Sequence, residues 1–541
     1  MHVLLVNLPD PYDVNPHLMR ERHERHLPPL GMAYVAATLL AEGHTVELID
    51  GAFPKLGSSA SRTDDIFGKI LAGNYDVVGL YLTVLGLHWG LYLARRVRNA
   101  RPNTWIIAGG PQPTITTESF LAQNPEIDVV VRGEGERTMC ELLRRRQQDL
   151  AIDNVAGIAY QAAGGVRLTE TRQLINDLDS LPWPARDLLP SLADYAHIRD
   201  PHTGRPCAAT SMITSRGCPF HCTFCSMPTY ARANRGKRWR ARSAASVAEE
   251  AKHVVRNFGI ERIIFCDDHF LLDIERVRCL AQEWQAQNVG ATFSFSARVT
   301  QVIRATPILS QLRRVGCTTI EIGVESGSQR ILDILRKGTT VDQNRVAIQT
   351  LLNHGIVPVV DFIMFVPDTT LDDLEKNLTF YEEINSLHYF PFRWQNKLVP
   401  LPGTQATVEL GLDDSTVDWA AGPLDYDFTD AAVGQVYAAI QRFEAETAWR
   451  TWLDRCEQLA NVNGQQTTPR WQANLRLMQT ILRRLPLFVF RQLLAMARSG
   501  RLEIEISSLI YKTKSHLDRL KNRIEALEAA VSVNEHILIT E

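Results

Sequence analysis

Three cysteines lie within eight residues of the chain, in the segment SRGCPFHCTFCSMP. Cys218, Cys222 and Cys225 have the spacing CxxxCxxC and directly follow an apolar run. Thiolates on one short loop can bind three irons of a 4Fe–4S cluster. The fourth iron would then have no protein ligand, and an open metal position can bind a small molecule. The sequence therefore predicts an iron–sulfur site with one iron free for a reactant.

Two other interpretations of the cysteine loop remain open. A zinc site normally has four nitrogen or sulfur ligands, with a second ligand pair further along the chain. His221 lies inside the loop, but no second pair follows at such a spacing, so zinc is the weaker interpretation. Cys207, eleven residues before Cys218, is a candidate fourth ligand of a closed, structural cluster.

The composition bounds the class of protein. The other six of the nine cysteines are scattered through a chain of 541 residues, which indicates a reducing compartment and a cytoplasmic protein rather than a disulfide framework. A net charge of −3 gives no reason to expect nucleic acid as a partner. No apolar run reaches the ~18 residues of a transmembrane helix. The N-terminal MHVLLVNLPDPYD lacks the basic region, long apolar stretch and cleavage site of a signal peptide. It is therefore interpreted as a first strand.

Residues 1–146 alternate predicted strands with predicted helices. The strands are 2–7, 45–50, 76–82, 104–110 and 128–136. Continuous apolar strands are buried on both faces, so we predict an α/β domain with a doubly wound, Rossmann-like parallel sheet. Such sheets bind ligands at the carboxyl ends of their strands. The candidate binding residues there are Thr83, Val84, Leu85, Gly109, Gly110, Pro111, Arg132, Gly133 and Glu134. Taken alone, the glycines could equally serve only to turn the chain.

The rest of the chain divides into three predicted parts. Residues 147–205 form a connector with a small hairpin, and residues 206–405 form a partial (β/α)6 barrel. Its strands are expected at 211–217, 262–268, 292–298, 318–326, 358–366 and near 392–401, with the chemistry at their carboxyl ends. Residues 406–541 are mostly helical. A long amphipathic stretch at 501–532 is expected to pack on the barrel, with dimerisation as the alternative.

The motifs resemble those of a known family. CxxxCxxC with Phe224 before the third cysteine resembles the signature of the radical S-adenosylmethionine superfamily. The segments PPLGMAYVAATLLAEGHTVELID, AGGPQPT and VVRGEGERT resemble the cobalamin-binding module of its class B subgroup. The resemblance covers about residues 1–405. It implies a 4Fe–4S cluster, S-adenosylmethionine and cobalamin as cofactors, and a one-electron donor such as flavodoxin or ferredoxin.

The resemblance also implies roles for individual residues. Cys218, Cys222 and Cys225 would be the metal-binding, catalytic cysteines. The contacts to S-adenosylmethionine are expected at Phe224 (adenine), Asp267 and Asp268 (amino group), Arg298 (carboxylate or ribose) and, in the loop after the fourth barrel strand, Glu325 and Ser326. One segment departs from the family pattern, because FIMFVPDTT (362–370) lacks the glycines often found there. Its ribose and adenine contacts are therefore in doubt.

A missing motif bears on the state of the cobalamin. The D-x-H-x-x-G motif that supplies a histidine ligand to cobalt does not occur; Asp267 and His269 have its first spacing without the glycine. Cobalamin would then have no histidine beneath it, and the mostly apolar segment 83–86 would face its lower side. This pattern favours transfer of a methyl group to a substrate radical.

The resemblance thus implies a cobalamin-dependent radical methyltransferase. It would methylate an unactivated carbon, or a phosphinate phosphorus, of a small biosynthetic intermediate by means of a 5′-deoxyadenosyl radical and methylcobalamin. One alternative is a non-methylating oxidative cyclase or ring-rearranging enzyme of the same architecture, and another is a cobalamin-binding sensor or carrier. The candidate substrate contacts, for which rim packing is an equal alternative, are Tyr389, Arg393, Trp394 and Lys397.

Overall fold

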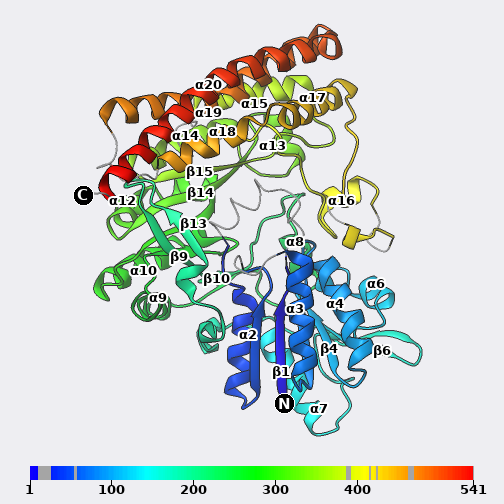
Figure 1. The fold of residues 1–541 in the computed structure, drawn as a ribbon. Coiled ribbons are helices and arrows are strands. Elements are labelled where there is room, and N and C mark those ends of the chain that lie inside the picture. The colour runs from blue at the N-terminus through cyan, green and yellow to red at the C-terminus, as the bar shows by residue number, and fades with distance from the viewer. Residues whose placement is uncertain are drawn as a thin grey trace.

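The computed structural model describes residues 1–9, 26–53, 58–384, 392–412, 416–421, 424–460 and 468–539, with side chains up to residue 530. The N-terminal region is built on a seven-stranded sheet in the order β2-β1-β3-β4-β5-β6-β7 (Figure 1). The strands are β1 (His2–Asn7), β2 (Thr45–Asp50), β3 (Val77–Tyr81), β4 (Trp105–Gly109), β5 (Val129–Val131), β6 (Ile158–Ala162) and β7 (Gly165–Leu168). β1 to β5 are parallel, which confirms the predicted doubly wound sheet.

Helices cover both faces of this sheet. They are α2 (Leu30–Ala41), α3 (Ser59–Ala72), α4 (Leu87–Ala100), α5 (Pro111–Ile115), α6 (Thr117–Gln123) and α7 (Gly135–Gln147). α2 packs against α7, and α3 packs against α4. The chain leaves β1 toward β2 on one side and returns to β3 on the other, so the strand order reverses beside β1. A crevice forms at such a reversal, outside the carboxyl ends of the strands.

The second sheet is the expected half-barrel. Its order is β15-β14-β13-β12-β9-β8, with bounds β8 (Ala196–Arg199), β9 (Pro206–Met212), β12 (Arg262–Phe265), β13 (Thr292–Arg298), β14 (Cys317–Glu325) and β15 (Val357–Phe362). β9 and β12 to β15 are parallel. Helices α9 (Ala244–Phe258), α10 (Ile274–Ala286), α11 (Val299–Arg304), α12 (Thr306–Arg314), α13 (Gln329–Ile334), α14 (Val341–Asn353) and α15 (Leu371–Glu383) alternate with them.

The strand expected near 392–401 is not formed. Only one bridge, between Phe365 and Lys397, joins this segment to the end of β15. The backbone carbonyl of Asn396 accepts the N–H groups of both Met364 and Phe365, and the Leu398 N–H donates to the Phe365 carbonyl. These few bonds join the segment to the chain at and beyond the end of β15 without forming a ladder. Proline at 400 and 402 removes two of the N–H donors that a longer ladder would need.

The predicted connector is shared between the two sheets. Its hairpin consists of β6, which pairs antiparallel with β5, and β7. The sequence predicts the hairpin turn at Gly164–Gly165, and the structure has it one residue earlier, at Ala163–Gly164, because Gly165 already pairs with Ala162. Three short 3-10 helices follow, and β8 then pairs antiparallel with β9. The domain boundaries at 146, 205 and 405 stay a prediction.

The C-terminal region is helical, as the sequence predicts. Its helices are α16 (Gln405–Glu409), α17 (Ala431–Thr447), α18 (Trp449–Leu459), α19 (Pro469–Arg498) and α20 (Leu502–Ile539). α19 lies on α15 of the half-barrel, and α17, α18 and α20 pack against it (Figure 1). No helix in the described ranges has the length and apolar character needed to cross a bilayer.

Candidate functional site

A cavity of about 420 Å³ lies between the two sheets. One wall comes from the carboxyl ends of β3, β4 and β5 and from the start of α2. The other comes from the segment that follows β9 and from the end of β12. Six predicted binding residues line it: Gly109, Gly110, Pro111, Gly133, Glu134 and Asp268. The fold thus brings the strand ends of the N-terminal domain up to the half-barrel's cysteine loop.

Glycines shape the N-terminal wall of the cavity. Gly110 has φ +104°, and a Cβ there would lie 2.7 Å from the carbonyl oxygen of Leu82, so only glycine fits. Gly31, at the start of α2, has free space instead: a Cβ at that position would meet no atom within 4 Å. Its backbone borders open cavity space. A glycine wall lets a large flat ligand lie directly on the backbone.

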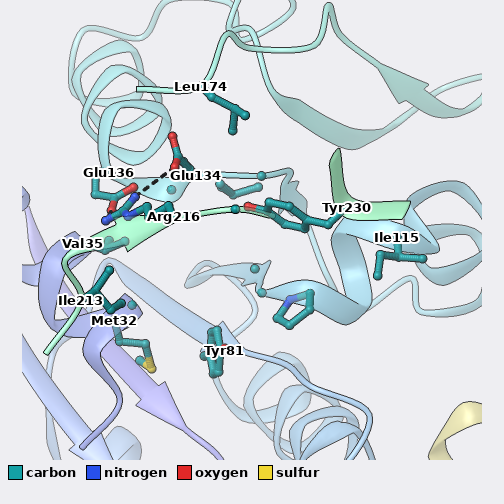
Figure 2. Close-up of a pocket in the computed structure, with 18 of the residues that line it drawn as sticks. Met32, Val35, Tyr81, Ile115, Glu134, Glu136, Leu174, Ile213, Arg216 and Tyr230 are labelled. Atoms are coloured by element: carbon teal, nitrogen blue, oxygen red, sulfur yellow. Dashed lines mark hydrogen bonds and ion pairs between the residues drawn. The ribbon is translucent and has the colours of Figure 1, made fainter. Parts of the chain in front are cut away.

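Two tyrosines are among the polar residues that line the cavity. Tyr81 ends β3, and Tyr230 lies on α8 (Met227–Arg232). Figure 2 shows both rings among the lining residues. Burial raises the pKa of both phenols, with Glu134 and Glu136 adding to the effect at Tyr230. Both therefore stay protonated and can donate a hydrogen bond to a polar group on a bound ligand.

Glu134 joins the two halves of the site. Its Oε1 accepts hydrogen bonds from Arg216 Nη1 at 3.2 Å and from Arg240 Nη1 at 2.7 Å, and its Oε2 accepts one from the backbone of Ile175. Arg216 also donates to Glu136 at 2.6 Å (Figure 2). These side chains are buried. The sequence predicts Glu134 as a cofactor contact, and the structure shows its carboxylate occupied by an ion-pair network between the domains.

Four other predicted residues lie away from the cavity lining. Thr83, Val84 and Leu85 form the loop after β3, where the Thr83 hydroxyl accepts a hydrogen bond from the Gly86 backbone. Arg132 faces the β6–β7 hairpin and donates to the carbonyl of Thr169 at 3.2 Å. Tyr81 is the lining residue contributed by the end of β3.

The cysteine loop lies between β10 (Ser215–Arg216) and α8. Cys218, Cys222 and Cys225 are all free thiols. Arg298 Nη1 lies 3.0 Å from the sulfur of Cys222, and the Met227 backbone N–H lies 3.4 Å from that of Cys225. Hydrogen bonds of this kind tune a cluster's potential. The donor set therefore fits a 4Fe–4S cluster.

Other metal arrangements fit the loop less well. In the described part of the chain, no three His, Cys, Asp or Glu side chains converge on a point that would hold a single metal ion. A cluster does not require convergence, since each thiolate binds its own iron. Cys207 is buried near the start of β9 and contacts the Arg205 carbonyl. It lies at the opposite end of that strand from the loop, which argues against a closed cluster.

The two aspartates after β12 have different surroundings. Asp267 is buried and accepts hydrogen bonds from the backbone and hydroxyl of Thr214 and from the hydroxyl of Ser215. Asp268 accepts one from the Gly217 backbone at 2.8 Å and faces the cavity. Burial raises the pKa of both carboxyls. Asp268 is the one left accessible to a ligand's amino group, and Asp267 holds the start of the cysteine loop.

Arg298 forms the centre of a stack beside the loop. Its guanidinium lies 3.9 Å from the centre of the Phe220 ring, and that ring stacks on His269 at 5.3 Å. Arg298 also donates to the backbone carbonyl of Lys337. Both nitrogens of His269 are buried without a hydrogen-bond partner among the described residues, and burial lowers the pKa of this imidazole to about 4.

The loop after β14 contains strained backbone. Glu325 has φ +64°, an uncommon and costly conformation for a residue with a side chain. Its carboxylate accepts a hydrogen bond from Lys337 Nζ at 2.5 Å. The Ser326 hydroxyl donates to Asn377 at 2.7 Å and is buried. Ser326 thus fixes the loop, and Glu325 with Lys337 forms a charged pair near the Phe224 ring.

A second cavity, of about 590 Å³, borders the loop on the Phe224 side. Its other lining residues come from the end of β15, from the segment 395–401 and from α17: Phe362, Ile363, Gln395, Asn396, Lys397, Leu398, Val399, Leu401, Tyr437 and Gln441. Three aromatic rings, of Phe224, Phe362 and Tyr437, beside side-chain amide groups suit a purine base. The departure from the family pattern at 362–370 therefore still leaves space for a base.

The interior of the half-barrel is acidic. Ser296 on β13 donates a hydrogen bond to Glu321 on β14 at 2.7 Å, and Asp361 on β15 lies on the same face. The Asp361 side chain is exposed to the barrel lumen, and partial desolvation by the surrounding barrel, with further contributions from Glu321 and Glu325, raises its pKa to about 8. Asp361 is therefore mostly protonated at neutral pH.

The candidate substrate contacts near the last barrel segment have different positions: Trp394 packs the rim, whereas Lys397 lines the second cavity. Trp394 is buried, and its indole N–H donates to Glu444 at 2.8 Å. Lys397 Nζ lies 3.9 Å from the centre of the Tyr426 ring and pairs with Asp425. Tyr389 lies outside the described residues.

Sequence comparisons place the chain among known proteins. The family model described as the radical SAM superfamily matches residues 212–381, and that of the B12 binding domain matches residues 17–143. The "Uncharacterized methyltransferase PH0819" of Pyrococcus horikoshii is 32% identical, over 70% of this chain and 77% of its own length. The anaerobic magnesium-protoporphyrin IX monomethyl ester cyclase of Synechocystis is 28% identical, over 73% and 76%.

Solved structures agree with the fold. The cobalamin-dependent S-adenosylmethionine radical enzyme OxsB, with aqua-cobalamin and S-adenosylmethionine bound, matches with a TM-score of 0.76 at 19% identity, over 99% of this chain and 83% of its own. The radical S-adenosylmethionine methyltransferase TsrM from Kitasatospora setae, with cobalamin and a [4Fe–4S] cluster, matches with a TM-score of 0.56 at 17% identity, over 79% of each chain. At these identities the likeness concerns the fold.

Several site residues are not predicted from the sequence. Tyr81 ends a predicted strand, so the rule that ligands bind at strand ends could have identified it. Tyr230, Arg216 and Gly31 give no such signal, because only the packing of the two domains brings them to the cavity.

Proposed function

The chain belongs to the cobalamin-binding branch of the radical S-adenosylmethionine superfamily, and we propose that it is a methyltransferase of that branch. The observation that carries the proposal is a single cavity bordered by the glycine wall of a B12-binding domain and by the cysteine loop of the radical domain. Two cofactors at opposite sides of one cavity can act on the same substrate.

The residues fit the three cofactors as follows. Cys218, Cys222 and Cys225 would hold the cluster. The glycine wall with Tyr81 would hold cobalamin, and the cavity beside Phe224 would take the adenine of S-adenosylmethionine. When bound, the cofactors supply radical generation and the methyl group.

The chain's own side chains then hold and shield the reactants. Asp268 would bind the amino group of S-adenosylmethionine, and Arg298 would bind its carboxylate while staying beside Cys222. The buried pairs of Glu134 and Glu136 with Arg216 hold the domains together and keep water out of the junction. Tyr81 and Tyr230 donate hydrogen bonds but supply no base.

The barrel interior is proposed to meet the substrate. Ser296, Glu321 and a protonated Asp361 lie on the lumen face of three adjacent strands, where they can hydrogen-bond hydroxyl or amino groups. The substrate is proposed to be a small biosynthetic intermediate with an unactivated carbon or a phosphinate group. We further propose a cytoplasmic location and a one-electron donor of the flavodoxin or ferredoxin type.

A second candidate is the non-methylating cyclase, favoured by the 28% identity to the magnesium-protoporphyrin cyclase. The products distinguish the two. The anaerobically reconstituted protein, loaded with hydroxocobalamin, is given dithionite and S-adenosylmethionine with a deuterated methyl group. A methyltransferase releases S-adenosylhomocysteine and leaves deuterium in the extracted cobalamin. Formation of 5′-deoxyadenosine without any S-adenosylhomocysteine would favour the cyclase, and neither product would favour a carrier or sensor.

A further inference from the structure

The segment around the cysteine loop has an unusual charge. Residues 201–248 contain eight Lys and Arg and no Asp or Glu, although the whole chain has a net charge of −3. Three of these cations are buried against acids from other segments. Arg216 and Arg240 pair with Glu134, and Arg242 pairs with Glu250. The other five are exposed, and one of them, Arg238, also lines the edge of the cavity between the sheets.

Four exposed cations follow the loop within seven residues, and we call them the basic strip: Arg232, Arg235, Lys237 and Arg238. Arg235 pairs with Glu170, but both side chains are mostly exposed, and such a pair is weak. Arg232 donates to the Thr229 hydroxyl, which is neutral. Lys237 and Arg238 form no ion pair with any carboxylate in the described ranges. The strip therefore keeps most of its positive charge.

The strip lies directly on the cysteine loop. Arg238 Nη1 is 2.9 Å from Nε2 of His221, which lies between Cys218 and Cys222. Gly217, the residue before Cys218, has φ +91°, and a Cβ there would lie 2.0 Å from the Arg238 carbonyl oxygen. The backbones of strip and loop are thus in close contact, so a protein bound to the strip lies beside the cluster ligands.

We propose that the basic strip docks an acidic one-electron carrier protein, which transfers one electron to the cluster. The carrier is oxidised by one electron, the cluster is reduced by one, and no bond forms or breaks. The inference rests on the proposed function, which needs an electron from outside the chain. Opposite charges speed the encounter and orient it, and electron-transfer complexes use small polar surfaces of this kind.

Reduction of the cluster by two donors tests the proposal. Reduced flavodoxin, an acidic carrier, and dithionite are each mixed with the reconstituted full-length protein in a stopped-flow instrument, at low and at high salt. The test variant combines Arg232→Glu, Arg235→Glu and Lys237→Glu. The matched control is Arg144→Glu, at an exposed arginine in the last turn of α7, whereas the first turn of that helix lines the cavity.

The expected result is specific to the carrier. The triple variant should accept electrons from flavodoxin at least ~10-fold more slowly at low salt, a typical size for lost electrostatic steering, and added salt should slow only the wild type and the control. The rate of reduction by dithionite should stay within about twofold of the wild-type rate, because a small reductant needs no docking surface.

Three results would overturn the proposal. The first is an unchanged rate with flavodoxin in the triple variant. The second is an equal loss of reduction rate with dithionite, which would mean that the strip stabilises the cysteine loop and does not dock the carrier. The third is stronger binding of the strip to nucleic acid or anionic vesicles than to the carrier. A wild-type protein that forms no cluster would instead refute the proposed function, and the docking surface with it.

Discussion

The two cofactor regions of this protein are built in opposite ways. The cluster region uses three cysteines from a single eight-residue segment. The cavity beside it is assembled from the ends of three strands, the start of α2 and residues of the half-barrel, and it relies on backbone and small side chains more than on a motif. A local site can be removed by one substitution, whereas an assembled site should lose affinity in steps.

Loss of one cluster ligand should have the largest effect. Cys222→Ala should abolish the 4Fe–4S cluster and all cleavage of S-adenosylmethionine, since the other two cysteines hold too few irons. Cobalamin binding should remain near the wild-type level. Iron, sulfide and cobalamin assays on one preparation measure both. Cys279→Ala, at an exposed cysteine outside the motif, is the control. Loss of cobalamin together with the cluster would refute the separation of the two regions.

The junction between the regions should be nearly as sensitive. Glu134→Ala removes the carboxylate partner of Arg240 and one of the two carboxylate partners of Arg216, and breaking a buried pair in this way costs about 3–5 kcal/mol. The thermal midpoint should fall, and amide exchange should rise on both sides of the cavity.

Asp64→Asn, which breaks an exposed pair with Arg96, is the control for Glu134→Ala. It should change stability by less than about 1 kcal/mol. Equal amide hydrogen exchange around the cavity in Glu134→Ala and Asp64→Asn would show that Glu134 does not hold the domains together.

Filling the cavity should have an intermediate effect. Gly31→Leu puts a side chain into open space beside the cobalamin wall and should weaken cobalamin binding by roughly tenfold, equivalent to about 1.4 kcal/mol. The cluster content should not change. Gly31→Ala and Gly68→Leu are the controls, because Gly68 is a helical glycine with equally open surroundings outside the cavity. An unchanged cobalamin affinity in Gly31→Leu would show that cobalamin does not bind beside Gly31.

The smallest expected effect is a change in the pH dependence of folding stability. Partial desolvation in the barrel lumen, with Glu321 and Glu325, raises the pKa of Asp361 to about 8, above the value of about 3.9 in an unfolded chain. The folded state therefore binds the extra proton, and the resulting stability is lost as pH rises from about 4 through 8. Asp361→Asn should flatten the fall in melting temperature between pH 6 and pH 9.

The control for Asp361→Asn is Asp342→Asn, at a carboxylate that is 89% exposed. This variant should follow the wild-type curve of melting temperature against pH. A wild-type curve that is flat over the same range, or one that Asp361→Asn leaves unchanged, would contradict the account of the acidic interior.

The same comparison explains what the sequence could predict. The cysteine spacing and the strand ends predicted the position of the cysteine loop and the cavity-lining glycines at 109, 110 and 133, because these features are local, and the cluster ligands themselves stay a prediction. Thr83 to Leu85 and Arg132 also follow strand ends but do not line the cavity; Thr83 bonds within its own loop and Arg132 bonds to the end of the hairpin. Tyr230 and Gly31 depend on domain packing, and no spacing along the chain reports that. The strand near 392–401 failed because apolar residues there bury against α17 and α19 rather than pair in a ladder.

The most direct test of the central claim is the cofactor content of one anaerobic preparation reconstituted with iron, sulfide and hydroxocobalamin. The account predicts about four irons and about one cobalamin per chain, with cobalamin lowered by Gly31→Leu and iron lowered by Cys222→Ala. A folded protein with a full cluster that retains no cobalamin would contradict it.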